Sequence, residues 1–322
     1  MKLHSVITKG VNPQILFEIK RLSAKIKQDS TLQAILEYVD SQTSLLRQYG
    51  FNPDTRNIPG HVRIGLHNHF PKTSGWYNWY TGNFNPKKLP EFAQAARIQG
   101  FDIVSLSNYS DDSVFSGNPG IKFEFKEGKI IVLRSQECLE LGDIQPVGYT
   151  GNLDMGNLER AIDSTIAQGG FVLFPHPANQ AYRGAGEELV ARHRQKIVIE
   201  TQNILANFPW FFRFADMVAK EWSLKYEIPG VSGVDSHNLY MSGGFYVRNS
   251  LLDLTSPESI VAGLVNLIEL RRSEMHASNS LISGLIINTE DYPNFWNPLV
   301  RELVPQIKTS YEYGKRNYLG KS

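Results

Sequence analysis

Two histidines stand one residue apart at the end of an apolar run, in the segment VRIGLHNHF of residues 62–70. Side chains at positions i and i+2 of a strand project from the same face, so His67 and His69 are expected to point to one place. Close imidazoles repel each other when both are protonated, and they gain by sharing a cation. The pair therefore indicates a site for a divalent metal ion.

Further candidate ligands follow other apolar runs of the chain. Glu137 follows IIVLRSQ, His176 follows FVLFP, and Asp235 and His237 stand in GVSGVDSH. Because active sites of α/β barrels form at the carboxyl ends of the strands, these side chains are expected at one barrel mouth together with the first pair. Neutral imidazoles and carboxylates suit Zn, Mn or Fe, and we expect one or two such ions.

The elements that must position these residues follow from the hydrophobic pattern. Strand-like runs lie at 61–66, 102–106, 129–134, 171–174, 196–200 and 230–234. Helical stretches lie between or after them, at 88–99, 157–168, 209–222 and 256–272. Short apolar strands that alternate with helices are typical of a parallel sheet buried on both faces, and hence of an α/β fold.

We expect three regions along the chain. Helical periodicity over 12–48 and a Gly/Pro/Asn-rich connector at 49–60 predict an N-terminal helical extension, residues 1–60. Residues 61–275 then form the metal-binding barrel. Residues 276–322 are predicted to be a C-terminal helical tail packed on the barrel, with a helix at about 295–309.

Composition narrows the class of protein. Lys plus Arg (33) nearly balance Asp plus Glu (32), which argues against a basic surface for nucleic acid. The chain has 1 cysteine, and its N-terminus lacks the apolar core of a secretory signal. No apolar run reaches the ~18 residues of a membrane span. We therefore expect a cytoplasmic protein that does not enter membranes. The sequence leaves open whether the N-terminal helices cover the site or form a homo-oligomer interface.

The motifs, taken in order, resemble those of the PHP (polymerase and histidinol phosphatase) family of metal-dependent phosphoesterases. GLHNHF is similar to the family's His-x-His motif, GFDIVSLSNYS to its strand ending in Thr-Asp-His, and VLRSQECLE to its glutamate strand. DIQPVGYTG resembles the next strand, GGFVLFPHPAN the His-Pro motif and GVSGVDSHN the closing motif. The resemblance spans roughly residues 61–270. It implies a distorted, TIM-like, seven-stranded (β/α) barrel with a cluster of up to three metal ions at its mouth.

The resemblance also implies how the ions would be shared. His67, His69 and Asp235 would hold one ion, and Glu137 would bridge it to a second ion served by His176. In this arrangement all of the candidate ligands would surround one small cluster of metal ions.

Two or three positions depart from the family pattern, since the acidic residue that usually follows the first motif has no clear counterpart around Thr81 to Asn83. Ser107, Asn108 and Tyr109 stand where the family has Thr-Asp-His, and Gln145 stands where the family often has a histidine. The resemblance also implies that His237 would bind a third ion or complete the ligand set of the cluster. The departures favour a site of one or two ions, since three protein ligands plus water suffice for metal-activated hydrolysis.

The expected chemistry is hydrolysis of a small phosphate ester by a metal-activated water. His237 or His176 could protonate the leaving alkoxide. Arg183 and Arg134 are candidates to bind the phosphate through paired hydrogen bonds. Another strand end carries Glu200 and Asn203. We expect these two polar residues to support the metal ligands through hydrogen bonds.

Two other classes of protein stay open. An amidohydrolase-type metal hydrolase also begins with His-x-His, but it usually ends with a lone Asp and often has a bridging Lys. Here the last strand ends in Asp-Ser-His, and no lysine stands at a strand end. A catalytically degenerate PHP-like protein that binds a metabolite or a partner would account for Asn108, Tyr109 and Gln145.

Overall fold

The computed structural model describes residues 37, 58–69, 77–78, 83–107, 112–138, 141–179, 184–203, 213–236, 244–277 and 286–288. The predicted N-terminal extension and C-terminal tail lie almost entirely outside these ranges. Their boundaries, and the helix expected at 295–309, therefore stay predictions.

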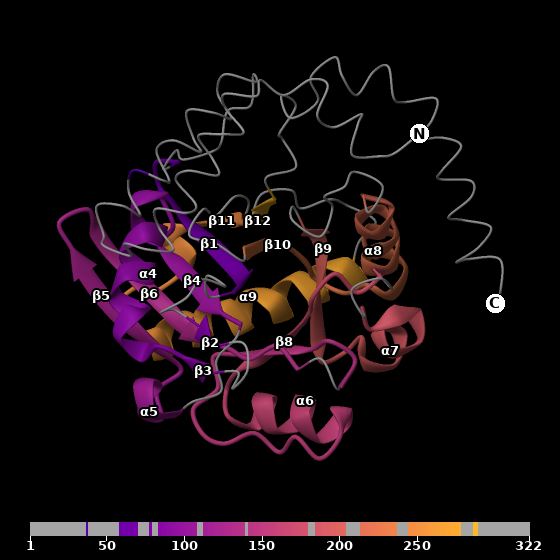
Figure 1. Ribbon diagram of the computed structural model, residues 1–322. Helices are drawn as coiled ribbons and strands as arrows, with labels where there is room; N and C mark the ends of the chain where they lie inside the picture. The colour runs from indigo at the N-terminus through magenta and orange to yellow at the C-terminus, as the bar shows by residue number, and fades with distance from the viewer. Residues whose placement is uncertain are drawn as a thin grey trace, which may run out of the picture.

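Ten strands form one mixed sheet in the described part of the chain (Figure 1). Its main path runs β5 (Gly120–Phe125), β6 (Gly128–Arg134), β4 (Ile103–Leu106), β1 (His61–Asn68), β10 (Gly230–Ser236), β9 (Ile197–Asn203), β8 (Phe171–Phe174) and β7 (Gln145–Val147). Off this path, β11 (Phe245–Arg248) pairs with β1 and with β12 (Ile286–Asn288). A separate ladder joins β2 (Tyr77–Asn78) to β3 (Asn83–Phe84).

The predicted α/β class is confirmed, and each of the predicted strands lies in the parallel centre of the sheet, from β6 to β8. The predicted count of seven strands is wrong, because the main path has eight and curls into a half-barrel. Both ends of the path are antiparallel edges: β7 lies in DIQPVGYTG, which the family resemblance gives as a strand, and β5 is additional. An edge strand such as GIKFEF is only partly buried, so it lacks the continuous apolar run that marks the central strands.

Helices cover the outer face of the sheet (Figure 1). The helix α4 (Leu89–Ile98) packs on β4 and β6, and α6 (Leu158–Ala167), α7 (Gly186–His193) and α8 (Arg213–Tyr226) pack on β8 and β9. Short helical turns are η1 (Pro86–Lys88), α5 (Asp112–Phe115) and η5 (Asn249–Leu251). In the part of the chain that the structure describes, we find no helix with the length and apolar character needed to cross a bilayer.

The start of α6 illustrates how the sequence fixes these helices. The side chain of Asn157 accepts a hydrogen bond from the backbone N–H of Arg160, one of the N–H groups in the first turn that have no acceptor within the helix. Leu158, Ala161 and Ile162 then recur at spacings of three and four, so one face of the helix is apolar and packs on the sheet.

The inner face of the sheet is filled by the last described helix, α9 (Pro257–Ala277). Ile260, Val261 and Leu264 of α9 lie in one apolar cluster with inward side chains of the central strands. Gly148 has φ +73°, and a Cβ atom there would lie 2.7 Å from Val261 Cγ2. A glycine is therefore needed where the helix approaches the chain after β7. Because α9 occupies the concave face, the site must form at an end of the strands.

Replacing Leu264 by Ala should lower the free energy of unfolding by about 2–5 kcal/mol, because it leaves a cavity between α9 and the sheet. Urea unfolding followed by circular dichroism measures this loss. Leu270→Ala is the matched control on the same helix, since Leu270 is 46% exposed and should change stability by only about 0.5 kcal/mol. Equal losses in the two variants would contradict the packing of α9 on the sheet.

Candidate metal centre

The strand β1 changes course at its carboxyl end. Its pairing with β10 shifts register between Leu66 and Asn68, and His67 between them has φ 60°, a left-handed conformation that side-chain-bearing residues rarely adopt. The N–H of His67 donates to Ser105 Oγ at 3.1 Å, and the side-chain amide of Asn68 donates to the carbonyl oxygen of Gly65 at 2.7 Å. These hydrogen bonds hold the distortion in place.

The distortion brings His67 and His69 together. Their Nε2 atoms lie 3.1 Å apart, and their ring centroids lie 5.0 Å apart with the rings nearly edge to face. Both residues are buried, and His69 lies just beyond the last residue of β1. The convergence predicted from the i, i+2 spacing is present, but an irregularity in the strand produces it instead of the regular alternation of side chains.

The carboxylate of Glu137 lies between the histidines. Its Oε1 atom is 3.1 Å from His67 Nε2 and 3.8 Å from His176 Nε2, and its Oε2 atom is 3.3 Å from His69 Nε2. Burial raises the pKa of Glu137, but the charges of His69 and His67, the hydrogen bond with His67 and the charge of His176 outweigh this effect. Together they hold the pKa well below its usual range, so the carboxylate is ionised at neutral pH.

These donor atoms could hold a cation. One ligand atom each from His67, Glu137 and His176 lies within 4.8 Å of the other two. Ligand atoms about 2.0–2.1 Å from a tetrahedral metal ion are themselves about 3.3 Å apart. The Nε2 atoms of His67 and His69 match that spacing at 3.1 Å, and each faces a different oxygen of Glu137, at 3.1 and 3.3 Å. The donor set of imidazole and carboxylate suits Zn, Mn or Fe.

One buried carboxylate supports two of the histidines. Glu200 Oε1 lies 3.2 Å from His67 Nδ1, and Glu200 Oε2 accepts hydrogen bonds from the backbone N–H of His176 at 2.7 Å and the side-chain amide of Asn203 at 2.8 Å. When Nδ1 holds its proton against Glu200, His67 can use Nε2 to bind a metal ion in place of the hydrogen bond to Glu137. Glu200 thus contacts two candidate ligands, and Asn203 contacts Glu200; their support of metal binding stays a prediction.

A glycine on β10 makes room for this carboxylate. A Cβ atom at Gly233 would lie 1.3 Å from Glu200 Oε1, so any other residue would displace the carboxylate. Gly233 pairs with Asn203 across the sheet, and the N–H of Asn203 donates to the carboxylate of Asp216 on α8 at 3.2 and 3.3 Å. The position of Glu200 therefore depends on β9, β10 and α8 together.

Sequence analysis missed one residue of the site, Asp143. It is 1% exposed, and its Oδ2 atom lies 3.5 Å from His176 Nε2. Asp143 follows Gly142 in a turn and has φ 55°. Aspartate next to glycine is ordinary turn chemistry, so the sequence carries no signal that separates this residue from any other turn aspartate.

Gln145, which stands where the family often has a histidine ligand, makes hydrogen bonds to neighbouring strands. Its side-chain amide donates to Ser105 Oγ at 3.1 Å and to Ser135 Oγ at 2.7 Å, so it links β7 to the ends of β4 and β6. The other altered residues, Asn108 and Tyr109, lie outside the described ranges.

Arg134, a candidate for binding phosphate, lies buried at the end of β6. Its guanidinium carbon lies 4.3 Å from the centroid of the Tyr149 ring, and Nη1 donates to the carbonyl oxygen of Thr150 at 3.0 Å. These contacts give the side chain a place in the wall of the half-barrel. Its contact with a phosphate stays a prediction.

The structure describes only the backbone of one of three further predicted site residues. The backbone of Asp235 belongs to β10, where the neighbouring Ser236 pairs with Asn68, so residue 235 lies at the same end of the sheet as the His67/His69 pair. The Asp235 side chain lies outside the described part, as do all of His237 and Arg183. Their roles stay predictions.

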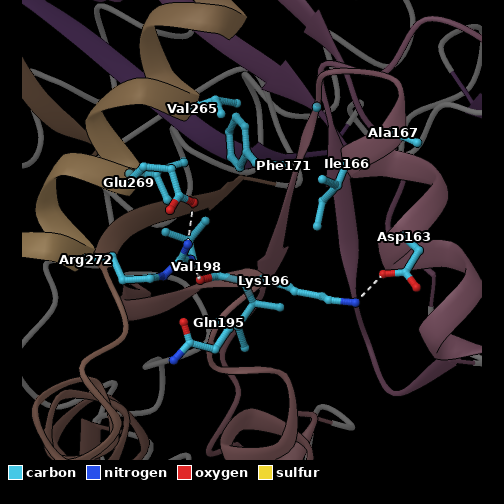
Figure 2. A pocket seen from close by; sticks show the side chains of 13 residues that line it. Asp163, Ile166, Ala167, Phe171, Gln195, Lys196, Val198, Val265, Glu269 and Arg272 are labelled. Atoms are coloured by element: carbon cyan, nitrogen blue, oxygen red, sulfur yellow. Dashed lines mark hydrogen bonds and ion pairs between the residues drawn. The ribbon is translucent and has the colours of Figure 1, made fainter. Parts of the chain in front are cut away.

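A pocket of about 470 Å³ lies at the opposite, amino ends of β8 and β9, away from the histidines (Figure 2). Its charged side chains pair with one another: Lys196 lies 2.6 Å from Asp163, and Arg272 binds Glu269 and donates to the carbonyl oxygen of Ile197 at 2.9 Å. These lysine and arginine groups are not metal ligands. The carboxyl end of the sheet, where the imidazoles converge, is therefore the better candidate site.

No protein-family model and no curated protein sequence matches the chain. Similar solved structures include a two-domain protein of Bacteroides vulgatus that contains a predicted PHP-like metal-dependent phosphoesterase, at 16% identity and a TM-score of 0.44. The match covers 68% of this chain and 65% of that one, so the chain spans less than two thirds of its length. PsfC from Pseudomonas syringae matches at 10% identity and a TM-score of 0.42, over 67% of this chain and 99% of that one.

Fold and site together define an α/β protein with a half-barrel sheet and a buried group of histidines and a glutamate that could hold a divalent cation. The particular activity has to be argued from the geometry of that group.

Replacing Glu200 by Gln should weaken the binding of Zn or Mn about 10- to 100-fold, because His67 loses the acceptor that keeps the proton on Nδ1. Isothermal titration calorimetry on metal-free protein measures the change. Glu188→Gln is the control, since the Glu188 side chain is 84% exposed on α7 and should leave the affinity unchanged. Unchanged affinity in Glu200→Gln would mean that Glu200 does not support the ligands.

Proposed function

We propose that the chain is a metal-dependent hydrolase that cleaves the phosphate ester of a small substrate. The observation that carries the proposal is the convergence of His67, His69 and His176 on the ionised carboxylate of Glu137, at the buried carboxyl end of the sheet. A divalent cation bound by these residues would acidify a water molecule and so supply hydroxide at neutral pH.

The last strand would complete the ligand set. Asp235 stands at the end of β10, beside the end of β1, and His237 follows it by two residues. We propose both as further ligands of one or two Zn, Mn or Fe ions. Three protein ligands with an open position suffice for hydrolysis, so the altered residues at Asn108 and Gln145 do not exclude it.

The chain's own residues would also bind the substrate and move a proton. If His237 or His176 is protonated instead of bound to a metal ion, it would give its proton to the leaving alkoxide. Arg183 and Arg134 are the proposed partners of the phosphate oxygens, since a guanidinium can donate two parallel hydrogen bonds to one phosphate.

The sequence favours a phosphate ester over an amide as the substrate. The last strand ends in Asp-Ser-His, and no lysine that could bridge two ions stands at a strand end. The contacts of Gln145 with Ser105 and Ser135 are compatible with a protein that has lost ligands and only binds a metabolite. Measurements of metal content and turnover separate these alternatives.

Changing both His67 and His69 to Ala should remove the bound metal and reduce phosphate-ester hydrolysis to background, because two of the converging donors are lost. Metal content is measured by mass spectrometry, and turnover is measured on a panel of phosphomonoesters, phosphodiesters and amides. His61→Ala is the matched control: His61 lies at the other end of β1, where its Nδ1 atom contacts the Pro59 carbonyl oxygen, and both readouts should stay normal.

The other outcomes are equally informative. A protein that carries no metal and gains no thermal stability from added Mn or Zn would contradict the metal-dependent function. Bound metal with turnover of amides alone would indicate an amidohydrolase-type enzyme. Bound metal without turnover of any ester or amide would indicate a binding protein.

A further inference from the structure

The strand β5 lies at the margin of the sheet (Figure 1), and its outer edge pairs with no strand in the part of the chain that the structure describes. The other end of the sheet path is different, because β7 is joined to the chain that follows β6. The N–H of Gly148 donates to the Arg134 carbonyl oxygen at 2.8 Å, and the N–H of Gln136 donates to that of Pro146 at 3.2 Å. The edge of β5 is therefore the one to which a further strand could add.

The register of β5 on β6 determines which of its backbone groups point outward. Ile131 of β6 donates its N–H to the carbonyl oxygen of Asp102, on the β4 side, at 2.9 Å. Lys122 stands opposite Ile131, and hydrogen-bonded and non-hydrogen-bonded pairs alternate along an antiparallel ladder. Lys122 therefore directs its N–H and C=O away from β6, and Glu124, two residues further on, does the same.

The side chains of β5 alternate between two faces. Ile121, Phe123 and Phe125 pack against the apolar cluster that contains α4, and the two phenyl rings are stacked with their centroids 6.0 Å apart. Lys122 and Glu124 project from the other face, where Nζ and Oε1 lie 3.7 Å apart. The three apolar side chains stay partly exposed, so a further strand would bury more of their surface.

We propose that β5 is a dimerisation strand, which pairs antiparallel with β5 of a second copy of the chain in the register that places Lys122 opposite Glu124. Charge complementarity selects this partner and this register. A shift by two residues in one direction would place Lys122 opposite itself, and a shift in the other direction would place Glu124 opposite itself; like charges directly opposite are destabilising. A shift by one residue would set outward-pointing backbone groups against inward-pointing ones, so the hydrogen bonds would be lost.

The two-fold pairing matches the side chains on both faces. Lys122 of each copy faces Glu124 of the other, and the same two residues exchange backbone hydrogen bonds. Ile121 faces Phe125, and Phe123 lies at the axis opposite its own copy, in a non-hydrogen-bonded pair where side chains approach most closely. Such an interface uses the free edge of both copies and closes as a dimer. No candidate metal ligand lies on β5, so the inference does not depend on the metal centre.

Charge reversal tests the proposal, with sedimentation velocity measured over a range of protein concentrations. The native chain should pass from monomer to dimer as its concentration rises. Glu124→Lys and Lys122→Glu each place like charges opposite one another twice across the two-fold axis, so each should weaken dimerisation about 10-fold. Ion pairs at exposed positions contribute little to stability, so both variants should fold, as their thermal unfolding will report.

Two combinations should restore the dimer. The double variant Lys122→Glu/Glu124→Lys again has opposite charges across the axis, and it should dimerise like the native chain. An equimolar mixture of the two single variants should form a mixed dimer, which native mass spectrometry detects, although each variant alone dimerises weakly. Glu188→Lys is the matched control: it makes the same change of charge on a side chain of α7 that is 84% exposed, and it should leave dimerisation unchanged.

Three results would overturn the proposal. A native chain that stays monomeric at every concentration would leave the edge of β5 to a strand of another protein. A native dimer that persists equally in both single variants would have its interface elsewhere in the chain. Loss of the dimer in the single variants, without recovery in the double variant or in the mixture, would contradict the pairing of Lys122 with Glu124.

Discussion

The buried carboxylate of Glu200 fixes the distance between the ends of β1 and β8. One of its oxygens contacts the ring of His67, and the other accepts the backbone N–H of His176, so the centroids of the two imidazoles lie 5.3 Å apart. A polar group in the interior is tolerated when it is hydrogen bonded, and the amide of Asn203 supplies a further donor. The shape of the site thus depends on one side chain and on the glycine at 233 that leaves room for it.

The site is also where the backbone departs most from regular geometry. Three of the non-glycine residues with positive φ in the described ranges are His67, Asp143 and His176, and all three contribute side chains to the group of donors. Each such residue costs of order 1–3 kcal/mol, and it persists only where its surroundings impose the conformation. The irregular end of β1 re-aims His67, as bulges beside functional sites commonly do.

Much of this site could be predicted because its members stand at strand ends. Apolar runs mark the central strands, and the carboxyl ends of parallel strands meet, so His67 and His176 were expected together although they are 109 positions apart. Asp143 could not be found in this way, because its position depends on the return of the chain from Cys138 to Ile144. The edge strand β5 was missed for a related reason: it is partly exposed, and pairing with β6 defines it better than its own residues do.

The position of α9 in the chain has a consequence for biosynthesis. The helix begins at Pro257, after every strand of the main sheet path has been made, yet its side chains at Ile260, Val261 and Leu264 cover the inner face of those strands. From the end of β1 to Ile260 is about 190 residues, which a ribosome translating at about 5–20 residues per second completes in about 10–40 seconds. During that interval the inward apolar side chains of these strands lack the helix on which they pack in the folded protein.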